Sequence, residues 1–286
     1  MHSLYHEFES DLKFRGLSEG TVVRYSLCLR HFMRFADAPV DKIGHYQVRN
    51  YLKYLLYHEK MGPANYKMHL AAVKFLFNAT LERPSVVANL PWPKVPRTLP
   101  DILSGQEVEA LLAAAESKKH HAIFATLYSA GLRISEACSL TVNDIDSSRM
   151  VIHVRDGKGK KDRFTILSKR LLEVLRDYWR RERPVLPYLF PGDIPGRPIT
   201  QEAIRQGLRP AAKAAGLRKR VTPHTLRHTF ACHLLASGVS LPVIQQLLGH
   251  ASIRTTMLYL QVSFEQIRGT VSPLDLLGTP NGQQLG

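Results

Sequence analysis

The sequence predicts a mainly helical protein of two domains, with one small β-hairpin in the second domain. Apolar residues recur at helical spacing through residues 1–90, and no strand-like alternation interrupts them. A proline-rich stretch, residues 89–100, then breaks the helical pattern. Beyond it the pattern resumes, apart from two short alternating segments around a tip rich in glycine and lysine.

Residues 1–90 are predicted to form a small helical bundle. Ser18 is placed to cap a helix that runs to about Ala36. The apolar face of this helix consists of Val22, Tyr25, Leu29, Phe32 and Met33. A second helix is marked by Val48, Tyr51, Leu52 and Leu55. Pro63 suits the first turn of a third helix, which carries Tyr66, Leu70, Val73 and Phe77. Basic residues such as Arg24 and Arg34 lie off the apolar face, where a solvated surface is the default interpretation.

An extended linker is predicted at residues 91–100. This segment holds Pro91, Pro93, Pro96 and Pro100, and prolines at this density favour an extended chain. Ser104 and Glu107 then have the spacing of a capping box, which opens a new helix. A second domain is therefore expected over residues 101–286.

The second domain is predicted to contain the hairpin and a series of helices. Strands at 150–155 and 162–167 flank the tip 156–161. Helices are expected at about 168–182, 201–215, 224–237 and 241–248 and near 253–260. Glycines that can end three of these helices are Gly216, Gly238 and Gly249.

The composition favours a polyanionic partner. The formal net charge is +15, and nucleic acid is the commonest partner of such a charge, although an anionic membrane surface or an acidic protein would also fit. The start of the chain does not resemble a signal peptide. The longest apolar stretch, roughly Ala122 to Leu132, falls short of the ~20 residues of a spanning helix. Three scattered cysteines, Cys28, Cys138 and Cys232, fit a reducing compartment. A soluble, cytoplasmic protein is expected.

Several polar residues of the second domain suit chemistry on a phosphodiester. Such a reaction needs a nucleophile, cations that hold the non-bridging oxygens, and an acid for the leaving oxygen. Arginine suits the second task because its planar fork binds two oxygens at once. Taken singly, each candidate has a structural explanation, as a surface cation, a helix cap or a core tyrosine. In chain order the candidates are Arg133, Lys158, His224, Arg227, His250 and Tyr259.

This set resembles the catalytic signature of the tyrosine recombinases, the family of lambda-type integrases and Xer-type recombinases. The similarity spans nearly the whole chain. Residues 16–25 resemble the opening of the family's core-binding domain, and residues 222–231 and 247–256 resemble its two C-terminal boxes. The resemblance implies a two-domain DNA clamp. Residues 1–90 would be the helical, SAM-like core-binding domain, and residues 101–286 the catalytic domain with a C-terminal exchange tail.

The resemblance also implies a role for each residue. Tyr259 would attack the scissile phosphate and form a 3′-phosphotyrosine, releasing a 5′-hydroxyl. Lys158 would be the general acid for the leaving oxygen, and His224 would assist proton transfer and phosphate binding. Glu136 would orient Arg133 or its neighbours. The transition state would be stabilised by Arg133, Arg227 and His250.

The implied partners are a double-stranded DNA recombination site and further copies of the chain. The resemblance implies that four protomers join two sites. Residues 272–277 suit a short capped helix with an apolar patch, which would dock on a neighbouring subunit or fold back on its own core. The sequence leaves that choice open, as it does the need for a second recombinase or an accessory protein. No nucleotide cofactor is expected, because a phosphotyrosine retains the energy of the broken bond.

Alternative functions weaken on inspection. His224 and His228 have zinc-helix spacing, with Cys232 and His233 nearby, but the glutamate of HExxH is missing and Arg227 lies between the two histidines. Neither clustered carboxylates for two metals nor a P-loop is present in the sequence, so no metal is expected. A type IB topoisomerase and a catalytically silent DNA-binding protein remain alternatives. Leu260-Gln261 departs from the Thr-His of many relatives, which leaves the subfamily open.

Overall fold

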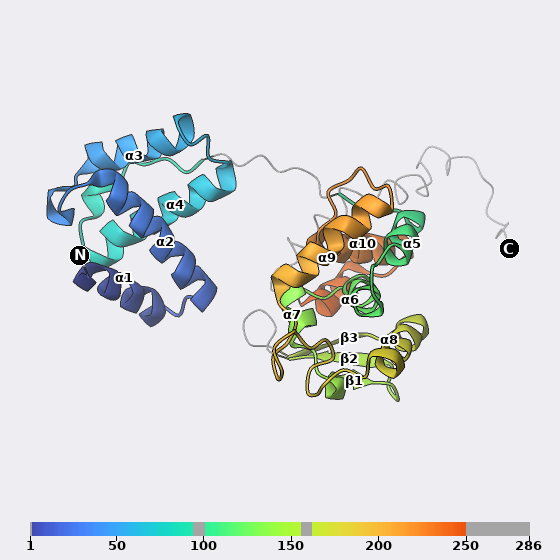
Figure 1. The fold of residues 1–286 in the computed structure, drawn as a ribbon. Helices are drawn as coiled ribbons and strands as arrows, with labels where there is room; N and C mark the ends of the chain where they lie inside the picture. The colour runs from blue at the N-terminus through green and yellow to red at the C-terminus, as the bar shows by residue number, and fades with distance from the viewer. Residues whose placement is uncertain (1, 94–100, 156–161, 250–286) are drawn as a thin grey trace, which may run out of the picture. The chain divides into compact units, whose positions relative to one another are not determined.

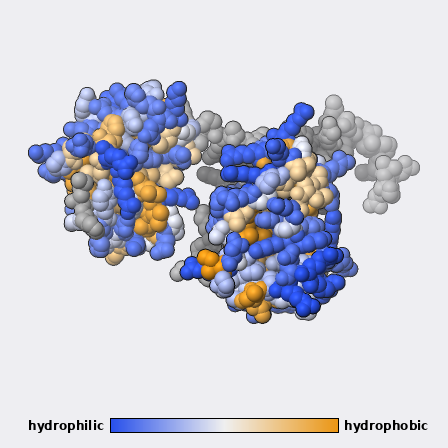
Figure 2. Space-filling view, in the orientation of Figure 1, coloured by the Kyte–Doolittle hydropathy of each residue, from blue (hydrophilic) through white to orange (hydrophobic). Residues whose placement is uncertain are grey.

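The computed structural model describes residues 2–93, 101–155 and 162–249, and it divides the chain into two compact units, residues 1–97 and 98–286. Figure 1 shows each unit as its own group of helices, and Figure 2 shows hydrophilic residues over most of the visible face of both. Within the described ranges, every helix is too short or too polar to cross a membrane. Each unit is described by itself below.

The first unit is a helical bundle, as the apolar periodicity predicts. Its helices are α1 (His2–Phe14), α2 (Glu19–Ala36), α3 (His45–Tyr57) and α4 (Pro63–Phe75), with helical turns at Val40–Lys42, Leu76–Thr80 and Pro84–Val86. Helix α2 packs against α1, α3 and α4 (Figure 1). The side chains of Phe8, Phe32, Tyr51 and Phe77 are fully buried between these helices. Burial of these large apolar side chains is the main source of stability of this unit.

Two details of the first unit differ from the expectation. Helix α1 was not placed individually, although Leu4, Phe8 and Leu12, at i, i+4 and i+8, form its buried face. Ser18 does precede α2, but its hydroxyl lies 3.0 Å from the Thr21 hydroxyl and caps no backbone amide. Ser18 therefore marks the helix start without the hydrogen bond that usually explains the preference.

A polar chain crosses the core of the first unit. The hydroxyl of buried Tyr51 lies 2.9 Å from His31 Nδ1 and 2.6 Å from His69 Nδ1. His31 Nε2 lies 3.0 Å from a carboxylate oxygen of Glu59. Burial, followed by the charge of His31, lowers the pKa of His69. A neutral His69 that shares the phenol with His31 satisfies a hydroxyl that would otherwise be buried without a partner.

The segment predicted as a linker begins against this unit. Leu90 is buried in its core, and the Trp92 ring centre lies 5.0 Å from Lys74 Nζ and 6.0 Å from Lys67 Nζ, both on α4. Cation–π contacts of this kind are worth about 0.5–1 kcal/mol at exposed sites. Of residues 91–100, those after Pro93 lie outside the described residues.

The second unit combines helices with a small sheet. Its helices are α5 (Gly105–Ala113), α6 (Lys118–Ser129), α7 (Ile134–Ser139), α8 (Lys169–Glu182), α9 (Gln201–Ala214), α10 (Pro223–Ala236) and α11 (Leu241–Leu248), with a helical turn at Val142–Asp144. Helix α6 packs against α8, α9 and α10 in the centre of the unit. The side chains of Ile123, Phe124 and Leu127 on α6 are fully buried there.

Local signals place most helix ends correctly. The Ser104 hydroxyl accepts from the Glu107 amide at 3.2 Å, and the Glu107 carboxylate accepts from the Ser104 amide at 2.7 Å, which confirms the capping box of α5. Gly216, Gly238 and Gly249 follow α9, α10 and α11 with φ of +67°, +83° and +61°. Glycine adopts this left-handed conformation without steric cost. The helix expected near 253–260 lies outside the described residues.

The predicted hairpin is present and gains a third strand. Strands β1 (Ile145–Asp146), β2 (Val151–Val154) and β3 (Arg163–Ile166) form an antiparallel sheet in the order β1-β2-β3 (Figure 1). The register pairs Ile152 with Thr165 and Val154 with Arg163. Ile152, Val154 and Thr165 are buried on the inner face of the sheet. Because side chains alternate along a strand, Arg163 also points to this inner face.

Candidate active site

The carboxylate of Glu136 is the centre of an arginine cluster in the second unit. It lies on α7 with only 5% of its side chain exposed. Its Oε1 accepts from Arg133 Nη1 at 2.6 Å, and its Oε2 accepts from the Arg133 backbone amide at 2.8 Å. Arg227 Nη1 on α10 lies 3.7 Å from Oε2. Two arginines singled out in the sequence are thus brought together by the glutamate expected to orient them.

A third arginine, Arg163, completes the cluster and was missed by sequence reasoning. Its Nη1 and Nη2 each donate at 2.8 Å to one oxygen of Glu136. Only 8% of its side chain is exposed. The signal that could have revealed it is the strand alternation, because Arg163 and the buried Thr165 are two residues apart on β3. A buried guanidinium is costly without a paired anion, and Glu136 supplies that anion.

The pKa of Glu136 reflects this environment. Burial alone would raise it, but the hydrogen bonds and charges of Arg163 and Arg133 outweigh burial and lower the pKa to about 2. The carboxylate is therefore ionised at neutral pH. Hydrogen bonds to the charged form and nearby cations both favour ionisation.

The same three arginines hold the C-terminal end of α11. Arg163 Nε donates to the carbonyl oxygen of Leu247 at 2.8 Å, Arg227 Nη2 to that of Leu248 at 2.5 Å, and Arg133 Nη2 to that of Gly249 at 3.0 Å. The last carbonyls of a helix lack intrahelical donors and carry partial negative charge. Three consecutive carbonyls are thereby satisfied by three cations, immediately before His250 in the sequence.

Two glycines permit the close packing around this cluster. Gly131, at φ +61°, accepts from Arg227 Nη1 at 2.7 Å through its carbonyl oxygen. A Cβ atom on Gly131 would lie 2.3 Å from Phe230 Cδ1, and one on Gly249 would lie 2.8 Å from Arg163 Cδ. Both positions need a positive φ and leave no room for a side chain.

His224 lies at the start of α10, one turn from Arg227. Its residue is exposed, yet crowding by protein atoms, followed by the charges of Arg227, Arg133 and Arg205, lowers its pKa. Burial, His224 and Arg227 lower the pKa of His228 to about 4. These histidines are therefore mainly neutral at pH 7. A neutral imidazole next to three guanidinium groups is able to accept or relay a proton.

The zinc alternative finds no support in this geometry. Within residues 2–93, 101–155 and 162–249, no group of three or more histidine, cysteine or acidic side chains is arranged to hold a metal ion. His233 Nδ1 lies 2.8 Å from the Tyr128 hydroxyl, and His233 Nε2 lies 3.0 Å from the Leu103 carbonyl oxygen. Both ring nitrogens of His233 thus have structural partners.

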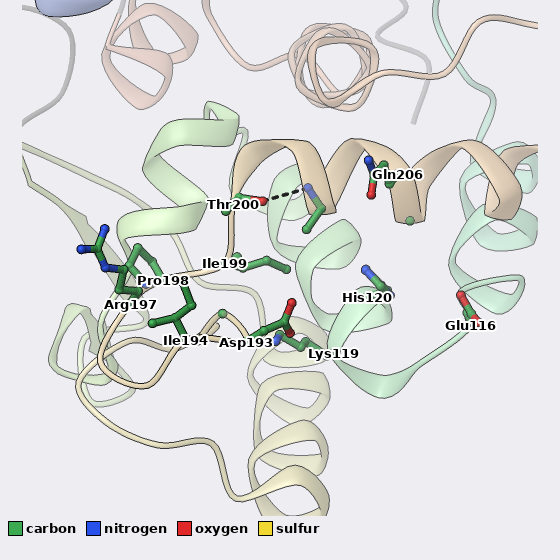
Figure 3. Close-up of a pocket in the computed structure, with 13 residues that line it drawn as sticks. Glu116, Lys119, His120, Asp193, Ile194, Arg197, Pro198, Ile199, Thr200 and Gln206 are labelled. Atoms are coloured by element: carbon green, nitrogen blue, oxygen red, sulfur yellow. Dashed lines mark hydrogen bonds between the residues drawn. The ribbon is translucent and has the colours of Figure 1, made fainter.

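A basic cavity of about 280 Å³ adjoins His224. Its basic lining residues are Arg205 and Arg209 of α9 and Arg220, which precedes the first turn of α10. A second cavity, of about 550 Å³, lies between α6, the 192–200 segment and α9 (Figure 3). Its lining mixes Glu116 and Asp193 with Lys119 and Arg197, and it contains none of the predicted site residues. The positive potential is therefore concentrated on the Glu136 side.

The described residues hold half of the predicted catalytic set. Arg133, His224 and Arg227 lie around the same cluster, with Glu136 between the arginines. Lys158, at the hairpin tip, and His250 and Tyr259, after α11, lie outside the described residues. Their places relative to the cluster remain predictions.

Comparison with known proteins identifies the family. The phage integrase family matches residues 101–266, and the N-terminal SAM-like domain of phage integrases matches residues 4–86. A protein of Sinorhizobium fredii named as a candidate integrase/recombinase, y4qK, is 46% identical over 98% of this chain and 91% of its own length. Tyrosine recombinase XerA of Pyrococcus horikoshii is 32% identical over 96% of this chain and 95% of its own length.

Solved structures agree. A XerA recombinase superimposes with a TM-score of 0.54 at 30% identity, covering 94% of this chain and 99% of that one. A XerH recombinase, in a pre-cleavage complex with difH substrate, gives 0.67 at 26% identity, covering 83% and 74%. A lambda integrase dimer on a COC′ core site gives 0.73 at 20% identity, covering 89% and 96%, which supports the fold alone. The chain therefore belongs to the phage integrase family of tyrosine recombinases.

Proposed function

We propose that this protein is a site-specific DNA recombinase that cuts and rejoins DNA through a 3′-phosphotyrosine at Tyr259. The observation that carries the proposal is the Glu136-centred cluster. It holds Arg133 and Arg227 in fixed positions beside His224. Fixed guanidinium groups in a site shielded from water are what stabilisation of a developing phosphorane requires.

The proposed reaction follows the role of each group. The Tyr259 oxygen attacks phosphorus and loses its proton, while the bond from phosphorus to the 5′ oxygen breaks. Lys158 gives a proton to that departing oxygen. The charge on the non-bridging oxygens is stabilised by Arg133, Arg227 and His250, and His224 assists the proton transfers. Attack by a 5′-hydroxyl from the partner strand reverses these steps and reseals the backbone.

The reaction needs no external energy source in this scheme. One phosphoester bond is exchanged for another of similar energy, so neither ATP nor a metal ion enters the balance. Members of this family named tyrosine recombinases match the chain over nearly its full length. Their similarity over both units favours recombination over a type IB topoisomerase or a silent DNA-binding protein.

The proposed partner is a duplex recombination site, bound by several copies of the chain. Solved relatives include a lambda integrase tetramer on a Holliday junction and XerH on difH substrate. For this chain we propose four protomers on two sites, joined through residues 272–277, which lie outside the described residues. A DNA substrate and three buried cysteines without disulfides support a cytoplasmic location.

Covalent trapping tests the proposed function. The purified full chain is incubated with a library of nicked duplexes, in which the fragment beyond the cut diffuses away and prevents resealing. We expect a protein–DNA adduct that survives denaturant, forms in the presence of a metal chelator, and yields a defined site on sequencing. Tyr259→Phe should bind the recovered site but form no adduct. An unchanged adduct from this variant would refute the assignment of the nucleophile.

The recovered site then separates the two DNA-cutting alternatives. Two copies of the site on one supercoiled plasmid should give recombinant products with the purified chain. Relaxation of supercoils without any exchange between the sites would favour the topoisomerase. An absence of both, with DNA binding retained, would favour the silent binding protein.

A further inference from the structure

Arg163 joins three elements that are distant in sequence. Its two Nη groups donate to the two oxygens of Glu136 on α7, and its Nε donates to the Leu247 carbonyl oxygen at the end of α11. The guanidinium fork matches a carboxylate in this two-bond geometry, which fixes direction as well as distance. Arg163 therefore ties β3 to both α7 and α11.

The hairpin register determines this placement. Arg163 pairs with buried Val154 across β2 and β3 and so points to the inner face of the sheet. Its side chain passes directly beneath Gly249, where a Cβ atom would lie 2.8 Å from Arg163 Cδ. A shift of the register by one residue would turn Arg163 outward. The position is thus set by backbone pairing and is not an adjustable surface contact.

The contacts of Arg163 differ from those of Arg133. Arg133 shares Oε1 of Glu136 and keeps 19% of its side chain exposed, whereas Arg163 is exposed by only 8%. All three nitrogens of the Arg163 guanidinium donate to protein acceptors. Arg133 thus retains an edge toward solvent, while Arg163 lies beneath it and contacts the same carboxylate.

We propose that Arg163 is a positioning residue of the active site, which fixes the Glu136 carboxylate and the C-terminal end of α11 so that Arg133 meets the scissile phosphate in the correct orientation. This inference rests on the proposed function. Arg163 does not contact the phosphate in this scheme. Its loss would displace Arg133 and the last residue before His250 without removing either cation from the site.

The test separates binding from cleavage. Full-length wild type and Arg163→Lys are compared on the recovered duplex site for affinity and for the single-turnover rate of adduct formation at saturating protein. Lysine keeps the charge but cannot hold two carboxylate oxygens and a carbonyl at once. We expect affinity within about two-fold and cleavage slowed about 100-fold, since a misplacement of about 1 Å has an effect of that order. Cleavage at the wild-type rate would overturn the proposal.

Arg149→Lys is the matched control. Arg149 donates from Nε to Asp146 at 2.7 Å on the same sheet, but 67% of its side chain is exposed. It makes the same kind of ion pair outside the cluster, so both affinity and cleavage rate should be retained. A 100-fold loss in this control as well would attribute the effect to the sheet in general and overturn the proposal.

A neutral substrate distinguishes positioning from direct charge stabilisation. A methylphosphonate at the scissile position removes one negative charge and with it part of the need for a cation. Arg133→Ala should lose less activity on this substrate than on the natural one, whereas Arg163→Lys should lose about as much on both. Equal relief of the two variants would mean that Arg163 acts on the phosphate charge itself, which would overturn the positioning role.

A double variant covers the case in which Arg163→Lys does not fold. Glu136→Gln with Arg163→Gln removes both charges together, so neither is left buried without its partner. We expect a folded protein that binds the site and cleaves it slowly, and wild-type cleavage would overturn the proposal. The two hypotheses fail separately. Absence of any Tyr259-dependent adduct in wild type refutes the proposed function, whereas a wild-type rate in the Arg163 variants refutes only the positioning role.

Discussion

Replacement of Glu136 by glutamine should destabilise the second unit far more than an ordinary loss of an ion pair. The pKa of Glu136 is lowered from 4.5 to about 2. A difference of that size corresponds to roughly 3 kcal/mol of stability at neutral pH. Removal of one partner from a buried ion pair costs about 3–5 kcal/mol, so the two magnitudes agree. For a unit of this size, the expected fall in Tm is about 6–12 °C.

The two tryptophans allow each unit to be followed on its own. Trp92 lies on the first unit, and Trp179, on α8, packs against the core of the second. In a Trp92→Phe background, fluorescence of Trp179 during urea unfolding reports the second unit alone. Unfolding of the two-unit chain need not be a single transition, and a local probe avoids that difficulty.

Glu109→Gln is the matched control. Glu109 accepts from Arg170 Nη1 and Nη2 at 2.5 and 2.7 Å, a two-bond pair like that of Glu136 and Arg163. Its side chain is 55% exposed and that of Arg170 is 71% exposed. Exposed pairs contribute about 0–1 kcal/mol. Burial is thus the main difference between the two sites.

The pH dependence gives a second check with a definite sign. The folded pKa of Glu136 lies below the unfolded value of 4.5. Its stabilisation is therefore complete above pH 4.5 and is lost as the pH falls toward 2. The difference between wild type and Glu136→Gln should narrow over that window. If Glu136→Gln loses no more stability than Glu109→Gln at pH 7, or if the difference persists at low pH, the reasoning about a buried, ionised carboxylate is refuted.

Two further predictions concern packing and a buried hydroxyl. Gly131→Ala should destabilise the second unit by about 2–4 kcal/mol, because φ is +61° and the new Cβ would meet the Phe230 ring. Gly196→Ala, at φ +72° with open space around it, should show the backbone effect alone, and equal urea midpoints would refute the clash. Tyr51→Phe should cost the first unit about 1–3 kcal/mol, because it leaves His31 and His69 without the shared hydroxyl. Loss of this stability is measured by Trp92 fluorescence in a Trp179→Phe background, and an unchanged midpoint would count against it.

Helix ends were predictable where local chemistry determines them. The capping box at Ser104 and the glycines after α9, α10 and α11 act within a few residues, so the sequence pattern contains the whole interaction. The two-residue strand β1 was not predicted. It exists only because Ile145 and Asp146 pair with β2, and such short edge pairing leaves no periodic signal.

The candidate site was predictable only in part. Arg133, Glu136, His224 and Arg227 were found through motifs, and the contacts within the described residues bring them together. Arg163 was missed because its burial depends on a partner 27 positions away in sequence. An arginine at the end of a strand normally indicates a solvated surface. Only the register of the hairpin and the ionised Glu136 reverse that expectation.

The choice of acceptors in this cluster suits a phosphate site. Within the described residues, the cluster holds three arginines and one glutamate, so its net charge is 3 − 1 = +2. Three mutually repelling cations need further acceptors, and these are the carbonyls at the end of α11. Carbonyl dipoles orient the guanidinium groups without cancelling their charge, whereas additional carboxylates would neutralise it. For the proposed reaction, a site that keeps two positive charges while its arginines are held rigid is ready for the dianionic transition state before DNA arrives.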